Sequence, residues 1–250
     1  MSNRSLVLVT GGLGGIGASL VETLSTSGYD VLSIDKEDSP DQVGLNHLRF
    51  DIRTLALESA SQVSLLETVR ERFPGQQVAG IVNNAAVQIL GAPEELTTSD
   101  FEVTFQTNVF AAFFITQAFL SDLKDQRGGV VNIGSIHSQL TKQHFSAYAT
   151  SKGALVALTQ SLAVDLAPDV RVNCVIPAAT DTPMLRASFE DEEAFKRLGE
   201  YHPLNRVAHP AEIGEVVKFL LGPQSSFITG STIRVDGGIG NVLSDPVTIR

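Results

Sequence analysis

The stretch TGGLGGIG, residues 10–17, decides the fold that we predict for this chain. It follows the apolar run LVLV (residues 6–9) and leads into SLVETL, which indicates a turn from a strand into a helix. Its glycines, spaced TGxxxGxG at Gly11, Gly15 and Gly17, let the backbone turn sharply and let a phosphate approach the amides at the positive end of the helix dipole. The alternative, a glycine-rich turn that serves only tight helix packing, stays open at this point.

The composition is typical of a globular protein with a substantial core: the chain has 250 residues, of which 43% are apolar and 18% charged. Its net charge of -10 disfavours a surface that binds nucleic acid, and no apolar stretch reaches the roughly 18 residues of a membrane span. The single Cys174 rules out an internal disulfide, and the five histidines lack ligand spacing. We therefore expect a soluble cytoplasmic protein with no metal site, no nucleic-acid partner and no membrane segment.

Short apolar runs alternate with helical patterns along the whole chain. Runs this apolar, without strict alternation, suit strands that helices cover on both faces. The sequence therefore predicts an α/β fold, with residues 1–250 as a single domain: a doubly wound, Rossmann-type parallel sheet of about seven strands flanked by helices. The predicted strands are residues 6–10, 30–35, 47–51, 78–84, 129–135, 170–176 and 231–236, and the predicted helices are 19–27, 60–73, 99–124 and 146–167.

In such a sheet, ligands bind at the carboxyl ends of the strands, near the point where the strand order reverses. Asp35 ends the second predicted strand, 18 residues after Gly17, where a carboxylate can accept both hydroxyls of an adenosine ribose and would repel a 2′-phosphate. This favours NAD over NADP, although the neighbouring Lys36 could partly accommodate such a phosphate. A solvated turn residue is the alternative for Asp35. The residues expected to meet at this edge are Thr10, Asp35, Asp51, Asn83, Ser135 and Pro177.

Tyr148 and Lys152 are four residues apart in a helical pattern, so both project from one face. A free tyrosine titrates near about 10, and a neighbouring ammonium favours the phenolate and should lower its pKa toward the working range of a general base. Ser135 ends the preceding strand, and the segment between can return the chain to the same edge. As a bare motif, YxxxK has an ordinary alternative, a pair on a solvated helix face.

With these residues, the chain resembles the single-domain branch of the short-chain dehydrogenase/reductase family over essentially its whole length. The resemblance implies that Tyr148 exchanges a proton with the substrate oxygen, while Lys152 lowers its pKa and holds the nicotinamide ribose. It also implies that Ser135 hydrogen-bonds the reacting oxygen and that Asn108 anchors a water linking Lys152 to solvent. The motifs that carry the resemblance are TGGLGGIG, NNAA (83–86), YATSK (148–152), RVNCVIPAATDT (171–182), HPLNR (202–206), ITG (228–230) and VDGG (235–238).

For the cofactor, which Asp35 predicts to be NAD, the resemblance implies Asp51 at the adenine ring, Asn83 and Ala85 along the adenosine ribose side, and Pro177, Thr180 and Thr182 around the nicotinamide amide. The chain departs from the family, which commonly has glycine, at Ala86 and Ala178; we expect an altered fit there, not lost activity. The full set of expected cofactor residues is Gly11, Leu13, Gly14, Gly15, Ile16, Gly17, Asp35, Lys36, Asp51, Ile52, Asn83, Asn84, Ala85, Tyr148, Lys152, Pro177, Ala178, Thr180 and Thr182.

The segment at about residues 183–206 corresponds to the family's mobile lid over the substrate, and its acidic run EDEE is expected to face water. Candidate substrate contacts are Gln88, His137, His144, Met184 and Arg186. Each has an ordinary alternative: a polar loop position for the histidines, solvent for Gln88 and a surface salt bridge for Arg186. The long helices 99–124 and 146–167 are apolar over more than one sheet face, which, with the resemblance, predicts a homotetramer.

The function that these residues favour is an NAD-dependent oxidoreductase that interconverts a secondary alcohol and a ketone, with Tyr148, Lys152, Ser135 and Asn108 as its catalytic set. The substrate is expected to be a small polar hydroxy acid, polyol or sugar. A reductase of 3-oxoacyl thioesters or of a steroid-like ketone is the alternative among enzymes. A non-catalytic NAD-binding regulator is the alternative from another class, and the Tyr148/Lys152 pair disfavours a methyltransferase.

Overall fold

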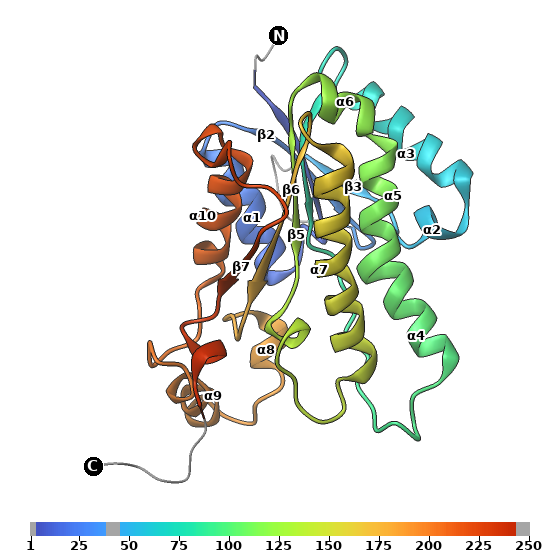
Figure 1. Ribbon diagram of the computed structural model, residues 1–250. Coiled ribbons are helices and arrows are strands. Elements are labelled where there is room, and N and C mark those ends of the chain that lie inside the picture. Colours follow the sequence, from blue (N-terminus) through green and yellow to red (C-terminus); the bar gives the residue numbers. More distant parts are fainter. Residues whose placement is uncertain (1–3, 39–45, 244–250) are drawn as a thin grey trace.

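A parallel sheet of seven strands forms the centre of the computed structural model, which describes residues 4–38 and 46–243 (Figure 1). The strand order is β3-β2-β1-β4-β5-β6-β7, so the chain reverses direction across the sheet between β1 and β4. This confirms the predicted doubly wound architecture. The strands are β1 (Leu6–Thr10), β2 (Asp30–Asp35), β3 (His47–Arg49), β4 (Val78–Asn83), β5 (Gly129–Ile133), β6 (Arg171–Pro177) and β7 (Thr232–Val235).

Helices cover both faces of the sheet, because successive side chains of each buried strand point to opposite sides. Leu6 and Leu8 of β1 pack with the helices of one face, and Val7 and Val9 pack with those of the other. The first face carries α2 (Thr54–Leu57), α3 (Ser59–Arg72), α5 (Ala111–Ala118), α6 (Leu120–Asp125) and α7 (Ser146–Leu166), and the second carries α1 (Gly15–Thr26) and α10 (Pro210–Leu221).

The prediction of one unbroken helix over residues 99–124 is wrong. This segment begins as α4 (Thr98–Phe105), behind a capping box formed by Thr97 and Asp100, and then passes through a π-helical turn, η1 (Gln106–Phe110), into α5 and α6. The buried amide of Asn108 binds both backbone groups of Val87, with its oxygen accepting at 2.8 Å and its nitrogen donating at 3.0 Å. A π turn is a local widening of a helix, and here it occurs where the helix binds a neighbouring loop.

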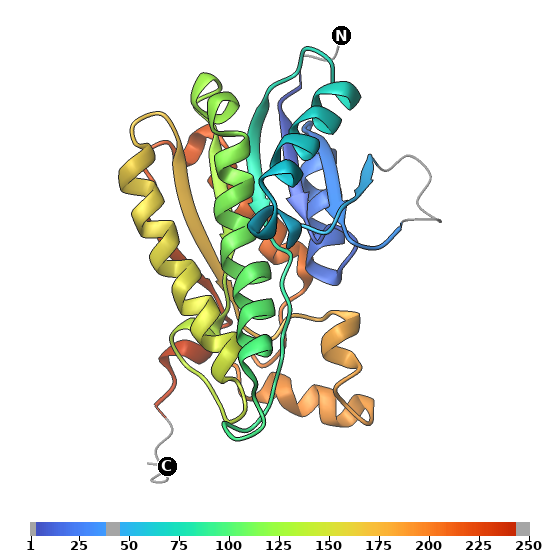
Figure 2. The ribbon, with the colours of Figure 1, turned by 90° about the vertical axis from the view of Figure 1, so that its right-hand side faces the viewer.

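The segment that follows β6 leaves the sheet at residues 179–181 and comes back beside them at residue 208. Its two ends pair side by side: Thr180 and Ala208 form a parallel bridge, and the Asp181 amide donates to the Ala208 carbonyl at 2.8 Å. Between these ends lie α8 (Pro183–Arg186) and α9 (Glu192–Glu200), which project beyond the carboxyl end of the sheet (Figure 2). We call residues 182–207 the lid segment and its paired ends, 179–181 and 208, the stem.

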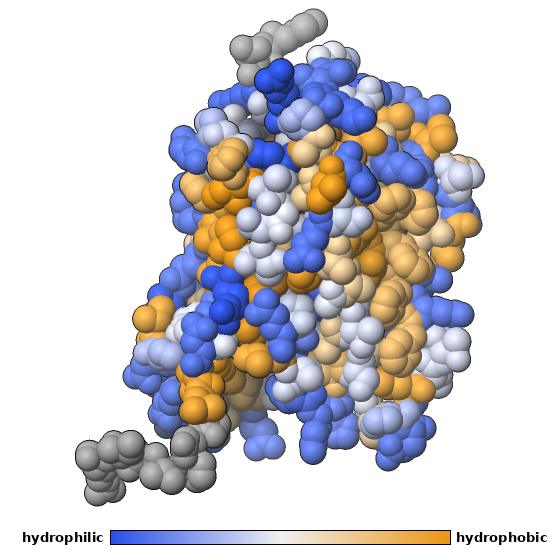
Figure 3. All heavy atoms as spheres, in the orientation of Figure 1, coloured by the Kyte–Doolittle hydropathy of each residue, from blue (hydrophilic) through white to orange (hydrophobic). Residues whose placement is uncertain are grey.

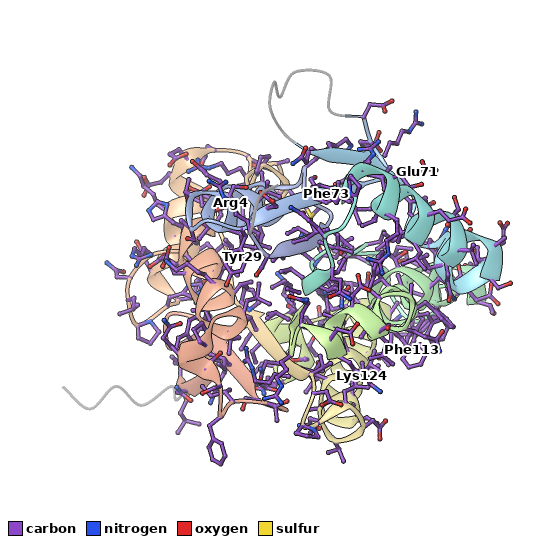
Figure 4. All side chains as sticks on the ribbon, turned by 90° about the horizontal axis from the view of Figure 1, so that it is seen from above. Arg4, Tyr29, Glu71, Phe73, Phe113 and Lys124 are labelled. Carbon is purple, nitrogen blue, oxygen red and sulfur yellow. The ribbon has the colours of Figure 1, made fainter. Side chains whose placement is uncertain are left out.

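The opposite edge of the sheet carries the residues that precede the strands. Figure 4 looks down on it, where Arg4, Tyr29 and Phe73 lie shortly before β1, β2 and β4. The strands therefore all deliver their carboxyl ends to the lid side of the molecule. Among the described helices, none is both long and apolar enough to cross a membrane.

Candidate active site

A crevice of about 500 Å³ runs along the carboxyl ends of β1, β2, β4, β5 and β6. Most of the predicted cofactor and catalytic residues therefore meet at the predicted edge of the sheet. The sequence-predicted residues that line it are Gly11, Gly14, Gly15, Ile16, Gly17, Asp35, Lys36, Asp51, Ile52, Asn84, Ala85, Gln88, Ser135, Tyr148, Lys152, Pro177, Ala178, Thr182 and Met184.

The glycine turn is locked against the loop that follows β4. The hydroxyl of the buried Thr10 accepts hydrogen bonds from the Asn84 and Ala85 amides, both at 3.1 Å, and the Asn84 side chain donates to the carbonyls of Thr10 and Gly11. A Cβ at Gly17 would overlap the Gly11 carbonyl oxygen and lie 2.8 Å from the Asn84 side-chain nitrogen. The turn therefore packs tightly against this loop and also lines the crevice, and its role in holding a phosphate stays a prediction.

The lid segment contacts the same turn. A Cβ added at Gly15 would lie 2.6 Å from the Cβ of Thr182 and 3.1 Å from Pro183. Thr182 begins α8 as its cap, with its hydroxyl accepting from the Leu185 amide at 3.2 Å. A side chain at position 15 would separate the start of the lid from the start of α1.

Asp35 lies at the end of the crevice formed by β2. Its carboxylate accepts from the amide of Leu13 at 3.2 Å and from that of Glu37 at 3.3 Å. Leu13 does not line the crevice, but it positions Asp35 through this bond. Lys36 beside it lies 3.7 Å from the Glu37 carboxylate, on an exposed surface.

Arg53 is a crevice residue that the sequence argument missed. It lies 3.8 Å from Asp51, which also accepts the Arg53 amide at 3.0 Å, and its buried Nε has no partner within the described part of the chain. Its position two residues after a strand-end aspartate is a weak signal that could have drawn attention to it. The other lining residues outside the predicted cofactor and substrate sets are Ile34, Phe50, Ala86, Val87, Val103, Thr107, Ile133 and Gly134.

Tyr148 and Lys152 lie together on α7, with the Lys152 Nζ 5.6 Å from the centre of the Tyr148 ring. Lys152 is 2% exposed and donates to the Ile133 carbonyl at 2.8 Å, and burial lowers its pKa to about 8. Burial raises the pKa of Tyr148, and a hydrogen bond with Ser135 only partly opposes this. The sequence argument expected the opposite direction. It counted the charge of Lys152 but not the loss of water around the phenol.

Cys174 lies on β6, where it is buried close enough to Lys152 for the lysine charge to act on its thiol. Burial raises the pKa of its thiol to about 11, which keeps it protonated and unreactive.

Asn108 is 2% exposed and lies behind the crevice wall. Besides its bonds to Val87, it donates to the Ser151 hydroxyl at 2.9 Å, and Ser151 donates to the Tyr148 carbonyl at 2.7 Å. Asn108 is therefore joined to the first turn of α7. Its expected role in a water path to Lys152 stays a prediction.

Besides Leu13, two more expected cofactor residues support the crevice without lining it. Asn83 is buried in the sheet and donates to the side chain of Asn132 at 2.8 Å. Thr180 belongs to the stem, and its hydroxyl donates to the Ala178 carbonyl at 3.1 Å.

The five candidate substrate residues separate in the structure. Gln88 and Met184 line the crevice, whereas His137 contacts the ring of Tyr148 from outside it. The other two lie elsewhere: His144 is exposed in the loop before α7, and Arg186 is bound to Asp181 and Glu192 at 2.5–2.8 Å. The surface salt bridge, given above as the alternative for Arg186, is the arrangement observed. Among the described residues, no group of three or more His, Cys, Asp or Glu could hold a metal ion.

Known proteins resemble this chain over nearly its full length. The family model that matches it is described as "Enoyl-(Acyl carrier protein) reductase" and spans residues 11–240. A tropinone reductase homolog of Arabidopsis thaliana is 34% identical over 92% of this chain and 88% of that protein, and L-xylulose reductase of Bos taurus is 32% identical over 92% and 94%. Ligand-free aldohexose dehydrogenase of Thermoplasma acidophilum has the same fold, with a TM-score of 0.91 and 27% identity over 98% of this chain and 97% of that one.

Proposed function

The chain belongs to the short-chain dehydrogenase/reductase family of nicotinamide-dependent oxidoreductases, and within that family we propose that it moves a hydride between NAD(H) and a secondary alcohol or ketone. The observation that carries the proposal is the shared crevice. The glycine turn and Asp35 border one part of it, and Ser135, Tyr148 and Lys152 border another.

The crevice has the donor set that a dinucleotide needs. The first turn of α1 holds no acidic residue, so its amides and the helix dipole are available to a pyrophosphate. Asp35 would hold the adenosine ribose, Asp51 and Ile52 the adenine, and Pro177 and Thr182 the nicotinamide end. When bound, the cofactor would supply or accept the hydride, while the protein orients the reactants, transfers the proton and provides the electrostatic environment.

The proton chemistry falls to Tyr148. In the oxidation, the phenolate takes the proton of the substrate hydroxyl while the hydride leaves the same carbon; in the reduction, the phenol returns a proton to the carbonyl oxygen. Ser135 hydrogen-bonds that oxygen and stabilises its developing charge. The ammonium of Lys152 favours the phenolate and so opposes, without reversing, the rise in the pKa of Tyr148 that burial causes.

The proposed cofactor is NAD, on the strength of the Asp35 carboxylate. Lys36 and Arg53 are the residues that could accept a 2′-phosphate, and both line the crevice. Kinetics with the two dinucleotides decide the matter, and a preference for NADP would contradict the role given to Asp35.

The proposed substrate is a small polar hydroxy acid, polyol or sugar. Gln88 and Thr107 give the crevice polar groups, and the similarity to an aldohexose dehydrogenase and an L-xylulose reductase supports a carbohydrate. A 3-oxoacyl thioester or a steroid-like ketone is the second candidate, and the similarity to an acetoacetyl-CoA reductase, 29% identical over 96% of this chain, supports the thioester.

We further propose a homotetramer in the cytoplasm. Apolar side chains gather over the face formed by α4, α5 and α7 (Figure 3), and Phe101, Phe110 and Val164 are exposed there. A second copy of the chain would bury this surface. The free, buried thiol of Cys174 suits a reducing compartment.

The deciding experiment is a turnover assay with a panel of sugars, polyols, hydroxy acids and acyl thioesters, with NAD and NADP. We expect NAD-dependent oxidation of at least one neutral polyol or sugar, and a loss in kcat of about 10²–10⁴-fold in Tyr148→Phe. NADH binding, measured by fluorescence, should be unchanged in that variant. If NAD binds tightly but Tyr148→Phe alters no measurable property, the non-catalytic regulator is the correct interpretation.

A further inference from the structure

Three aromatic rings meet beside the candidate active site. They belong to His137 in η2 (Ile136–Ser138), to Phe145 just before α7, and to Tyr148 in the first turn of α7. The His137 and Phe145 rings are stacked, with centroids 4.1 Å apart and planes 11° apart. Both meet the Tyr148 ring at a steep angle, at 6.0 Å and 73° for His137 and at 6.2 Å and 76° for Phe145. One stacked pair thus borders the phenol ring.

The first turn of α7 needs such support. Phe145 is the residue at its amino end, and a phenyl ring cannot accept hydrogen bonds from the orphan amides of a helix start. Tyr148 is three residues further on, in the part of a helix that frays most easily. The loop before it, residues 139–144, is exposed, so its side chains give this turn only partial cover.

His137 is itself held from two sides. Its amide donates to the Ser135 hydroxyl at 3.2 Å, and its Nδ1 lies 3.2 Å from the hydroxyl of Thr141. Lys142 lies with its Nζ 4.9 Å from the centre of the Phe145 ring. Burial and the charge of Lys142 lower the pKa of His137 to about 4, which keeps the imidazole neutral and stacked near neutral pH.

We propose that His137 is a positioning residue: by stacking on Phe145, it fixes the Tyr148 ring next to Ser135. The proposal rests on the proposed function, in which Tyr148 carries the proton. It gives His137 a different role from the substrate contact considered in the sequence analysis, because the ring acts through its neighbours and not through a bond to substrate.

The state of the phenol can be read directly, because the chain has three tyrosines and no tryptophan. An ultraviolet titration of tyrosinate in the wild type, minus the same titration in Tyr148→Phe, isolates Tyr148. The titratable and charged groups around this assembly are Lys152 on α7, Lys142 in the loop, Cys174 on β6 and His137 itself. A parallel titration of Lys152→Met separates the contribution of that charge.

In His137→Ala, water reaches the phenol, so the pKa of Tyr148 should fall toward its ordinary value of about 10. His137→Phe keeps a stacked ring and should keep the raised pKa. Kinetically, kcat of His137→Ala should fall by roughly tenfold, because the acid is misplaced, while KM for NAD stays constant. His137→Phe should retain most of kcat. Gln143→Ala, an exposed substitution in the same loop, is the matched control and should leave all readouts unchanged.

Two results would overturn the proposal. One is an unchanged Tyr148 titration and kcat in His137→Ala. The other is a His137→Phe variant as impaired as His137→Ala, with a raised KM for the alcohol and an unaltered titration, which would make the imidazole a substrate contact. His137→Gln replaces the alanine variant if circular dichroism shows that the latter does not fold. The titration needs no substrate, so it decides the positioning role even if the turnover panel refutes the proposed function.

Discussion

The floor of the crevice and the lid segment are held in place by different kinds of interaction. On the floor, the hydroxyl of buried Thr10 accepts from amides of the loop after β4, and the side chain of half-buried Asn84 donates to carbonyls of the glycine turn, all at 3.0–3.1 Å. In the lid, exposed side chains form the main polar contacts, above all those of Arg186 to Asp181 and Glu192. Buried polar bonds cost about 1–3 kcal/mol when broken, whereas exposed ion pairs are worth about 0–1 kcal/mol. The contacts that hold the floor should therefore be stronger than those that hold the lid segment.

The largest effect should come from the charge buried in the floor, that of Lys152. Its pKa of about 8, against 10.5 for a free lysine, means that between these values the unfolded chain holds a proton that the folded chain has released. The free energy of unfolding should therefore rise with pH across this window, by up to about 3 kcal/mol. As pH falls from 10.5 through 8, that stability is lost.

Denaturant titrations of the wild type and of Lys152→Met at about pH 7.5 and about pH 10, near the two ends of this window, measure the effect. The difference between the two proteins removes the contribution of all other groups that titrate. An equal pH dependence in both would show that the floor does not bury this charge as described.

The second effect should come from Gly17→Ala. The added methyl overlaps the Gly11 carbonyl oxygen, so the turn must move away from its partner loop. Overpacking of this kind costs about 1–3 kcal/mol, and cofactor affinity should fall by about 10- to 100-fold. Isothermal titration with NADH measures it. Ala18→Gly in α1 is the control, and it should retain the affinity for NADH. Gly28→Ala is not suitable, because the φ of Gly28 is +94°, a value that strains alanine.

The smallest effect should come from Arg186→Gln in the lid. Because Arg186 is exposed, loss of its ion pairs should leave the melting temperature nearly unchanged and alter KM for substrate by less than about threefold. Arg197→Gln, in the same segment, is the matched control. A loss of cofactor affinity as large as that of Gly17→Ala would erase the contrast between floor and lid.

The sheet was predictable because each strand is a short apolar run between turn-forming residues, and predicted strand ends such as Asp35 and Thr10 are observed. The same logic brought Asp35 and Ser135 to one crevice, since parallel strands end at one edge, and the first turn of α7 brings Tyr148 there. The π turn at Asn108 was not predictable, because the helical pattern is unbroken there and the bonds that accompany the turn go to Val87, in another part of the fold.

Electrostatic detail was also out of reach of the sequence. The direction of the Tyr148 pKa depends on how much water reaches the phenol, and this is set by rings brought together by folding. Arg186 and His144 illustrate the same limit: their places in the chain suggested a pocket, but Asp181 and Glu192 hold the first and solvent surrounds the second.

The paired stem makes the lid an insertion whose two ends are already joined. Thr180 and Ala208 pair directly, so the chain can close beneath a lid segment of another length, provided that residues 182–184, which contact the glycine turn or line the crevice, are kept. Loop closure grows only slowly in cost with length, by about 0.6 kcal/mol per doubling. Exchange of residues 185–207 would thus alter the cover of the crevice while Thr182 and the side chains proposed for proton transfer stay in place.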